Sequence, residues 1–324
     1  MAAIPFVTLD EPRYGQAVSV SPLIRRVIAN NPSKFTYHGT GTYIVGSGTD
    51  GVAVIDPGPR LDAHRDALLA ALDGQQVTAI LVTHCHADHA PLAGWLAEQT
   101  GAPTIGFGRH PRPDDDAAEE WTPIDEALAV PDEDAPRAEG EEREGVDYDF
   151  VPVIHAGDGD IVAGGDGWSI TAVHTPGHAA NHLCFALDAE RSLFTGDHIM
   201  GWSTTVVSPP DGDMSAYIDS LHKVIQRGDA VLWPTHGAPV TDPPPFLAAY
   251  LAHRLEREAH VLEAIRSGLD TVVAIVTALY ADVHPALHRP AARSVYAHIR
   301  KLIDDGRISA VGEAAPTAHY RVHG

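Results

Sequence analysis

Residues 84–89 read His-Cys-His-Ala-Asp-His, and this stretch decides both the fold and the chemistry expected of the chain. Imidazole nitrogens and carboxylate oxygens are the ligands that zinc and similar divalent metals prefer. A chain with 20 histidines in 324 residues would contain such a pattern by chance only rarely. The ordinary alternative is a solvated histidine cluster on a loop, and the flanking sequence argues against it.

The flanks of the motif have the pattern of a strand followed by a helix. Residues 77–82 form a short, continuous apolar run, which is typical of a strand buried on both faces. Residues 91–100 predict a helix with a proline near its start. Ligands at the carboxyl end of a buried strand lie where α/β proteins place their chemistry.

Three further candidate ligands occur in the same setting, each after a short apolar run and in a turn that contains Gly or Pro. They are His178 after residues 168–173, Asp197 after residues 192–194, and His236 after residues 230–233. A single histidine after a strand is more often a capping or core residue. Four such motifs in this order indicate one shared site.

The order and spacing of these motifs resemble the metallo-beta-lactamase superfamily, which implies a four-layer αββα sandwich. By this resemblance, each of two metal ions has three ligands of its own, and one aspartate bridges both ions. The first ion would take His84, His86 and His178, the second Asp88, His89 and His236, and Asp197 would be the bridge. Asp56, which precedes Pro-Gly after the apolar run 52–55, would brace the ligand loop. An ordinary turn aspartate is the alternative for Asp56.

The resemblance also separates subfamilies. His86 stands where flavodiiron-type members carry glutamate, which argues against an oxygen- or NO-reducing di-iron site. Asp197 stands where the antibiotic-destroying members carry Cys, Ser or a similar residue. We therefore do not expect β-lactam hydrolysis to be the main activity.

The chain is long enough for two domains. We place a metallo-beta-lactamase-like domain at residues 1–245 and a winged-helix-like domain at 246–324, because the proline run 243–245 ends the preceding structure. Helical spacing of apolar residues in the second part predicts three helices followed by a β-hairpin. The helices are expected at residues 246–267, 269–280 and 291–305, and the first hairpin strand at 307–311.

This tail is similar to the beta-lactamase-like protein 2 family. The similarity runs from about residue 40 to about residue 306 and rests on several short motifs. They are residues 211–214 with Tyr217 and 220–221, then 234–237, then 253–254 with 257–258. Gly41 departs from the family, where asparagine is expected. His253, Arg254 and Arg257 either pack the tail against the rim of the site or are solvated helix charges.

Formal charge is strongly negative, at −22, and much of it is concentrated in one segment. Residues 111–148 hold 15 Asp and Glu against 3 Arg. Such a segment buries too little apolar area to fold alone, so we expect a solvated insertion in the sandwich or a lid over the site.

We expect a hydrolase with two divalent metal ions, most simply zinc. Two such ions can hold a bridging hydroxide at neutral pH, which would attack the substrate while Asp88 orients it and accepts its proton. A small acyl substrate (an ester, a thioester or a lactone) fits best, because polyanions are repelled by the negative chain. The resembled family includes thioesterase-like hydrolases and also single-strand endoribonucleases.

The endoribonuclease is therefore the main alternative. His298 and Lys301 could contact a phosphate, but residues 246–324 hold 9 Lys and Arg against 8 Asp and Glu, which is no basic stripe. A mononuclear iron oxygenase, a DNA-binding winged-helix regulator and a non-catalytic scaffold are minor alternatives.

The remaining expectations concern location and partners. Cys85 and Cys184 imply no disulfide framework. No signal peptide pattern or bilayer-spanning run is found in the sequence, so a cytoplasmic protein without membrane partners is expected. A homo-oligomer is compatible with the sequence.

Overall fold

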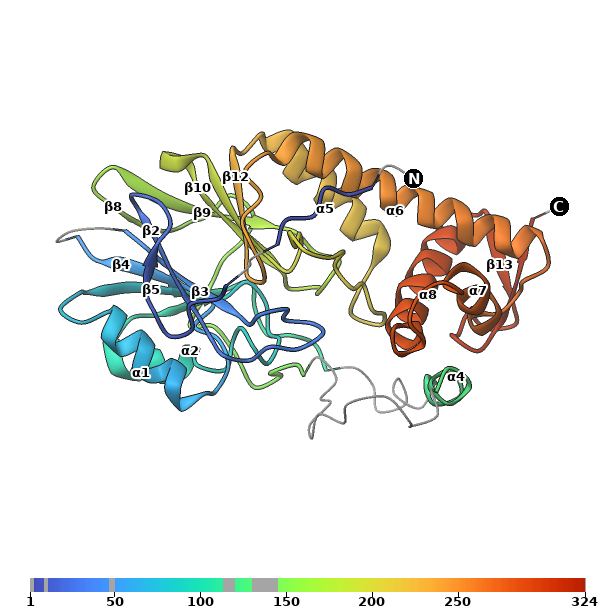
Figure 1. Cartoon of the computed structure of the whole chain (residues 1–324), viewed down its shortest axis with the longest axis horizontal. Helices are drawn as coiled ribbons and strands as arrows, with labels where there is room; N and C mark the ends of the chain where they lie inside the picture. The colour runs from blue at the N-terminus through green and yellow to red at the C-terminus, as the bar shows by residue number, and fades with distance from the viewer. Residues whose placement is uncertain (1–2, 9–10, 47–49, 113–119, 130–144, 324) are drawn as a thin grey trace.

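A computed structural model describes residues 3–8, 11–46, 50–112, 120–129 and 145–323 of the chain, and Figure 1 shows its arrangement. Short strands of residues 18–234 pair into two sheets that face each other. The first sheet contains β1 (Val18–Ser19), β2 (Ile24–Ile28), β3 (Gly41–Val45), β4 (Val52–Ile55), β5 (Val77–Leu81), β6 (Thr104–Gly106) and β7 (Ile154–His155), in that order. The second has the order β12 (Val231–Pro234), β11 (Ser192–Gly196), β10 (Leu183–Leu187), β9 (Trp168–His174), β8 (Ile161–Gly165).

Strand direction determines where the loops with candidate ligands meet. β4 and β5 pair in parallel, with Ile55 opposite Leu81, so both strands end at the same edge. β11 and β12 also pair in parallel, with Phe194 opposite Trp233. The segments that follow these four strands contain, in chain order, Asp56, the motif at residues 84–89, Asp197 and His236.

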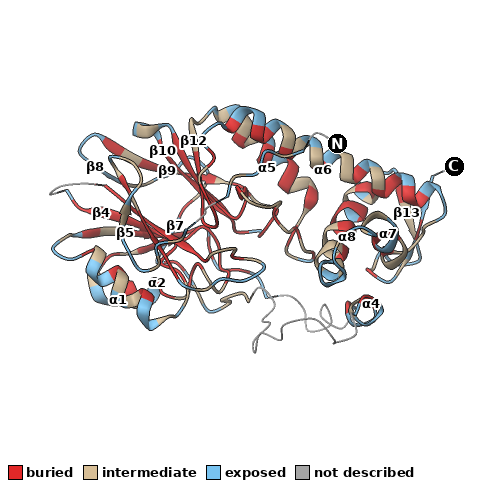
Figure 2. Ribbon diagram, viewed as in Figure 1, coloured by how far each residue is buried: buried red, intermediate tan, exposed pale blue. Residues whose placement is uncertain are grey.

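Buried residues lie along the strands of both sheets (Figure 2), and the alternation of their side chains builds the layers of the sandwich. On β3, Tyr43 and Val45 face the core between the sheets, while Ile44 faces the opposite side. Two helices, α1 (Asp62–Ala71) and α2 (Ala93–Thr100), pack on that outer side of the first sheet. This is the period of two expected of strands buried on both faces.

Two further helices cover the second sheet. The first is α5 (Met214–Arg227), which begins after Asp213, whose side chain accepts a hydrogen bond of 2.8 Å from the backbone N–H of Ala216. The second is α6 (Pro243–Arg266), whose prolines occupy the first turn, where a missing N–H costs nothing. The four-layer αββα sandwich implied by the resemblance is therefore confirmed.

The tail forms a second core around the far half of α6. It contains α7 (Val272–Leu279), α8 (His288–Asp304) and an antiparallel hairpin of β13 (Ile308–Val311) and β14 (His319–Val322). Three helices and a hairpin are the elements predicted for a winged-helix-like domain. Because the first half of α6 packs on the sandwich and the second half on this core, one continuous helix joins them (Figure 1).

Part of the acidic segment packs against this second core. The acidic composition of the segment does not predict this packing. Helix α4 (Thr122–Ala127) follows Trp121, which is buried against α8. The guanidinium of Arg293 lies 3.6 Å from the centroid of the Trp121 ring and 2.8 Å from the Asp125 carboxylate. Residues 113–119 and 130–144 of the expected lid lie outside the described residues.

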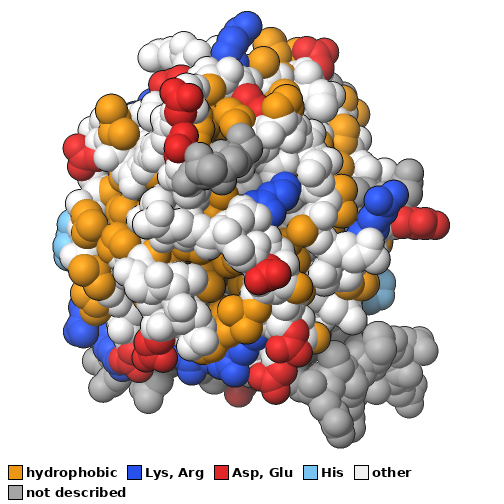
Figure 3. All heavy atoms as spheres, turned by 90° about the vertical axis from the view of Figure 1, so that its left-hand side faces the viewer, with side chains coloured by type: hydrophobic (Ala, Val, Ile, Leu, Met, Phe, Trp, Pro, Cys, Tyr) orange, Lys and Arg blue, Asp and Glu red, His pale blue; other side chains and the backbone are white. Residues whose placement is uncertain are grey.

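The face of the molecule on the left-hand side of Figure 1 has a mixed charge. Figure 3 shows Lys and Arg side chains interspersed with Asp and Glu side chains and with apolar patches. Among the described residues, no helix combines the length and apolar composition needed to cross a bilayer.

Buried histidines predict loss of stability in mild acid. Burial lowers the pKa of His64 to about 4, and burial followed by repulsion from Arg254 lowers that of His298 to about 3, from 6.5. The unfolded chain therefore binds more protons below pH 6.5. The free energy of unfolding is fully retained above that pH and falls by about 1.4 kcal/mol per pH unit per histidine as the pH drops towards each folded pKa.

Urea unfolding at pH 7 and pH 5 tests this expectation. The variant His298→Gln cannot titrate, so its unfolding free energy should decrease less between the two pH values than that of the wild type. His323→Gln, at an exposed position, is the matched control and should behave like the wild type. Equal decreases in all three proteins would contradict the assignment.

Candidate metal centre

All seven residues predicted as metal ligands lie together at the edge where the strands end. Their donor atoms form two groups, and within each group all atoms are within 4.8 Å of one another. The first group is His84, His86, His178 and Asp197, and the second is Asp88, His89 and His236. Asp88 is the most accessible of the seven, with 18% of its side chain exposed. The structure thus brings the seven predicted residues together, and their binding of metal stays a prediction.

Asp197 lies between the two groups. Its Oδ1 atom is 3.4 Å from Nε2 of His236 and 3.6 Å from Nε2 of His89. Its Oδ2 atom is 3.9 Å from Nε2 of His178. One carboxylate therefore presents an oxygen to each group, so Asp197 could serve as a ligand shared between them.

Backbone carbonyls fix the orientation of two of the imidazoles. The Nδ1 atom of His178 lies 2.7 Å from the carbonyl oxygen of Val206, and that of His236 lies 3.2 Å from the carbonyl oxygen of Gly39. A carbonyl only accepts hydrogen bonds, so each Nδ1 must carry the proton. The Nε2 atom of each ring is then the nitrogen that faces the cluster.

Thr83 and Asp56 orient two of the three imidazoles in the motif at residues 84–89. His89 donates from Nδ1 to Oδ2 of Asp56 at 2.9 Å. The Thr83 hydroxyl donates to the same carboxylate at 2.8 Å, so it must accept from Nδ1 of His84, 3.0 Å away. His86 differs, because its Nδ1 atom lies 3.3 Å from Nε2 of His178 within the cluster.

Asp56 is the centre of this supporting network. Besides the bonds from His89 and the Thr83 hydroxyl, its carboxylate accepts from the Thr83 backbone N–H at 2.8 Å and from the Thr235 hydroxyl at 3.1 Å. The residue is fully buried and has a left-handed backbone, with φ of 49°. Aspartate tolerates this conformation better than most residues. These contacts agree with the expected bracing role and not with an ordinary surface turn.

The pKa shifts of the histidines indicate that the carboxylates of the cluster attract positive charge. Burial, followed by repulsion from neighbouring imidazoles, lowers the pKa of His84 and His86, so both rings are neutral. Burial alone would also lower the pKa of His236, but the carboxylates of Asp197 and Asp88 outweigh it and raise that pKa to about 10. The carboxylates thus hold a proton at a position that a divalent cation would fill.

The residues fit a metal. Three buried donor atoms have no hydrogen-bond partner within the described chain, and they are Nε2 of His84, Nε2 of His89 and Oδ1 of Asp197. A buried polar atom without a partner is costly. Nitrogen and carboxylate ligands of this kind suit zinc and similar metals. These three atoms without hydrogen-bond partners therefore indicate that metal cations are their natural partners.

The loop after β11 connects the cluster to the tail helix. The Thr205 hydroxyl donates to the carbonyl oxygen of Asp197 at 2.7 Å, and the Arg254 guanidinium donates to the carbonyl oxygen of Thr205. Arg254 is buried, and its guanidinium lies 5.0 Å from the centroid of the Tyr217 ring. It therefore packs α6 against the rim of the site, as one of the two sequence interpretations expected.

The structure separates the two residues proposed to contact substrate. His298 is buried and lines a cavity beside this loop. Lys301 is held by carboxylates instead, with its ammonium 3.2 Å from Glu258 and 2.6 Å from Asp305. Neither belongs to the two donor groups, so any contact of theirs with substrate stays a prediction.

Sequence reasoning missed the threonines that support the ligands. Thr83 and Thr235 directly precede His84 and His236, and both donate to Asp56. The repeated Thr-His dipeptide was a signal that could have identified them. Thr40 had no comparable signal, although its hydroxyl donates to Oδ2 of Asp88 at 2.7 Å.

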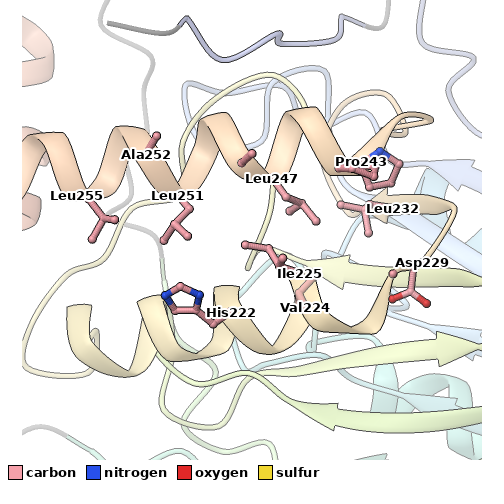
Figure 4. Close-up of a pocket in the computed structure, with 13 residues that line it drawn as sticks. His222, Val224, Ile225, Asp229, Leu232, Pro243, Leu247, Leu251, Ala252 and Leu255 are labelled. Carbon is pink, nitrogen blue, oxygen red and sulfur yellow. The ribbon is translucent and has the colours of Figure 1, made fainter.

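Two cavities accompany the cluster, and they differ in character. The larger, about 430 Å³, lies between α5 and α6, where Ile225, Leu247 and Leu251 point towards one another (Figure 4). Neither this cavity nor the smaller one is lined by any of the seven donor residues. The smaller, about 270 Å³, is lined by residues of the loop that braces His178 and by α6 and α8. Only the smaller one adjoins the candidate metal centre.

Comparisons with known proteins agree with this geometry. An atrochrysone carboxyl ACP thioesterase of Aspergillus chevalieri is 32% identical over 253 residues, which cover 76% of this chain and 67% of that protein. The atrochrysone carboxyl ACP thioesterase nsrC of Aspergillus novofumigatus (strain IBT 16806) is 29% identical over 304 residues, covering 89% and 81%. A solved beta-lactamase domain protein from Burkholderia ambifaria shares the fold, with a TM-score of 0.74 at 22% identity, over 97% of this chain and 95% of that one.

Family sequence models match both parts of the chain. The model of the metallo-beta-lactamase superfamily matches residues 38–236, which is more than half of the chain. The model of the beta-lactamase associated winged helix domain matches residues 271–315. The chain therefore belongs to the metallo-beta-lactamase superfamily, as a hydrolase with metal-binding clusters and an associated winged helix domain.

Proposed function

We propose that the chain is a thioester hydrolase that uses two divalent metal ions, zinc being the simplest choice. The observation that carries the proposal is the position of Asp197, whose two oxygens face separate groups of imidazole donors. The thioesterase names of the relatives support the choice of a thioester among acyl substrates.

The two donor groups would each hold one ion, with Asp197 shared between them. His84, His86 and His178 would hold the first, and Asp88, His89 and His236 the second. When bound, such ions lower the pKa of water and polarise a carbonyl oxygen. The protein residues described below determine how that chemistry meets the substrate.

Asp88 is the group best placed to handle a proton. It is the most exposed of the seven donors, and the hydroxyl of Thr40 fixes its Oδ2 atom by a 2.7 Å hydrogen bond. His236 and His89 lie 3.2 Å and 3.4 Å from the same oxygen and hold the pKa of the carboxyl well below its usual value, against the effect of burial. Asp88 is thus an anion that can orient water by accepting a hydrogen bond from it, although its lowered pKa makes it a weak base.

The chemistry of the leaving group favours a thioester over an amide. A thiol has a pKa of about 8.5, so the thiolate can depart without being protonated first. An amine needs a general acid to leave. A thioester therefore needs fewer proton transfers from the site than an amide does.

Metal depletion and a substrate panel test the proposal. The chain is expected to hydrolyse acyl thioesters, to lose this activity on treatment with a chelator and to regain it when zinc is restored. The panel should contain a thioester, an oxygen ester and a lactone of one acyl group, together with a labelled single-stranded RNA. Cleavage of the RNA without hydrolysis of any thioester would contradict the proposal and favour an endoribonuclease.

A further inference from the structure

A pocket at the junction of the two cores gathers positive charge in an otherwise acidic protein. It measures about 270 Å³, and Lys34, Thr205, Arg254, Arg257, Tyr280 and His298 are among the residues that line it. We call it the junction pocket. None of the described residues in its lining is an Asp or Glu. In a chain with 44 acidic and 22 basic residues, this composition is unusual.

The two arginines of the junction pocket have aromatic partners but no carboxylate partners among the residues that the structure describes. The Arg257 guanidinium lies 4.9 Å from the centroid of the Tyr280 ring, and that of Arg254 lies over Tyr217 and Tyr250. Arg254 donates to the carbonyl oxygen of Thr205, while its buried Nε atom has no hydrogen-bond partner among the described residues. Such guanidiniums retain charge and donors for an anion.

Neighbouring cations of the same region contrast with them. Lys301 and Arg307 both pair with the buried carboxylate of Glu258, at 3.2 Å and 3.0 Å. The charge at those positions is therefore neutralised within the protein. On α6, Glu258 pairs with these two cations, whereas no carboxylate of the described residues lies within ion-pair distance of Arg254 or Arg257.

Two residues that line the junction pocket also make hydrogen bonds to candidate metal ligands. Val206, which also lines the pocket, accepts the hydrogen bond that orients His178. Thr205 lines it too and binds the backbone of Asp197. A ligand in the pocket would thus touch the loop whose other contacts position two of the candidate ligands.

Neutral donors complete the pocket. His253 and His298 both line it, and burial followed by repulsion from Arg254 lowers their pKa values to about 4 and about 3. Both rings are therefore uncharged near neutral pH and offer N–H groups beside the guanidiniums. Ser294 adds a hydroxyl. This mixture of cations and neutral donors matches the oxygens of a phosphate.

We propose that the junction pocket binds the phosphate of a phosphopantetheine arm, through Arg257 and Arg254, while the thioester at the other end of the arm reaches the metal centre. The proposal rests on the proposed thioesterase function. Acyl groups are carried as thioesters on coenzyme A or on carrier proteins, and both carriers present the acyl group on this phosphorylated arm. The pocket would therefore select carried thioesters over simple ones.

Binding measurements on the metal-loaded protein test the proposal without requiring turnover. Calorimetry should show that the wild type binds 4′-phosphopantetheine about tenfold or more tightly than pantetheine, which lacks the phosphate. Arg257→Gln should abolish this preference, and Arg257→Lys, which keeps the charge, should retain part of it. Arg266→Gln removes the same charge from the same helix, at a position outside the pocket, and should keep the full preference.

Several outcomes would overturn the proposal. Equal affinity of the wild type for the two compounds would do so, as would equal losses in Arg257→Gln and Arg266→Gln. A single-stranded oligonucleotide whose binding depends on Arg257, when that of phosphopantetheine does not, would assign the pocket to RNA. Thermal unfolding of each variant shows whether a loss comes from misfolding, and the Arg257→Lys protein then provides the test.

Kinetics distinguish the two carriers and separate this proposal from the proposed function. A drop in kcat/KM of Arg257→Gln for the acyl carrier protein substrate alone, or for acyl-coenzyme A alone, identifies the carrier. Phosphate binding that depends on Arg257, without hydrolysis of any thioester, would support the pocket and overturn the proposed function. Thioester hydrolysis in a protein that binds phosphopantetheine and pantetheine equally well would support the proposed function and overturn the pocket proposal.

Discussion

Replacing Asp197 with alanine is expected to lower kcat for thioester hydrolysis by about 10³-fold, because the loss of a shared ligand removes electrostatic stabilisation worth several kcal/mol. Oδ1 and Oδ2 of this residue face different imidazole groups, so a single substitution disturbs both. Metal analysis of the purified variant should show fewer ions per chain than the wild type.

The matched control is Asp219→Ala, which makes the same change at an exposed position of α5. It should keep both metal content and activity. A wild-type rate in Asp197→Ala, with the full metal content still bound, would rule out a bridging role for this carboxylate.

Replacing Asp56 with alanine is expected to reduce the free energy of unfolding by about 3 kcal/mol or more, since it leaves several buried donors without an acceptor. The donors are the Thr83 backbone and hydroxyl, the Thr235 hydroxyl and Nδ1 of His89. Metal affinity should also fall, by about 10- to 100-fold, because the imidazoles that Asp56 orients lose their fixed direction.

Asp62→Ala is the control for this second substitution, because the Asp62 side chain is 95% exposed. Chemical denaturation of the metal-free proteins measures the stability effect separately from the metal effect. If Asp56→Ala unfolds at the same denaturant concentration as Asp62→Ala and binds metal equally well, then the hydrogen-bond network around Asp56 contributes neither stability nor orientation.

The motifs made the fold and the donors predictable. A short apolar run ending in a Gly, Pro or His turn is a local pattern, and His84, His178, Asp197 and His236 each follow one. Parallel pairing of the strands then brings such ends to one edge. This explains why residues far apart in the sequence could be assigned to one site.

The supporting contacts were less predictable because they depend on packing between distant segments. The carbonyl oxygens of Gly39 and Val206 orient two imidazoles, and any residue type supplies a carbonyl. The junction pocket likewise combines a loop at Lys34 with α6 and α8. Arg254 and Lys301 both lie on tail helices. A carboxylate neutralises Lys301, whereas Arg254 donates to a backbone carbonyl, and no local pattern in the sequence shows this difference.

The acidic segment shows how composition can conceal a short pattern. Its overall charge predicted a solvated insertion, yet Trp121, Ile124 and Leu128 have the spacing of one helical face and are buried against the tail. Arg293 then stacks on Trp121 and pairs with Asp125. A search for helical spacing within the acidic run would have identified this contact.

Titration of metal-free protein with zinc, followed by the rate of thioester hydrolysis, shows how many metal ions the site needs for activity. Activity should reach its maximum at about two equivalents of zinc per chain, in line with two donor groups that share Asp197. Full activity at one equivalent, or in the absence of any metal, would contradict it.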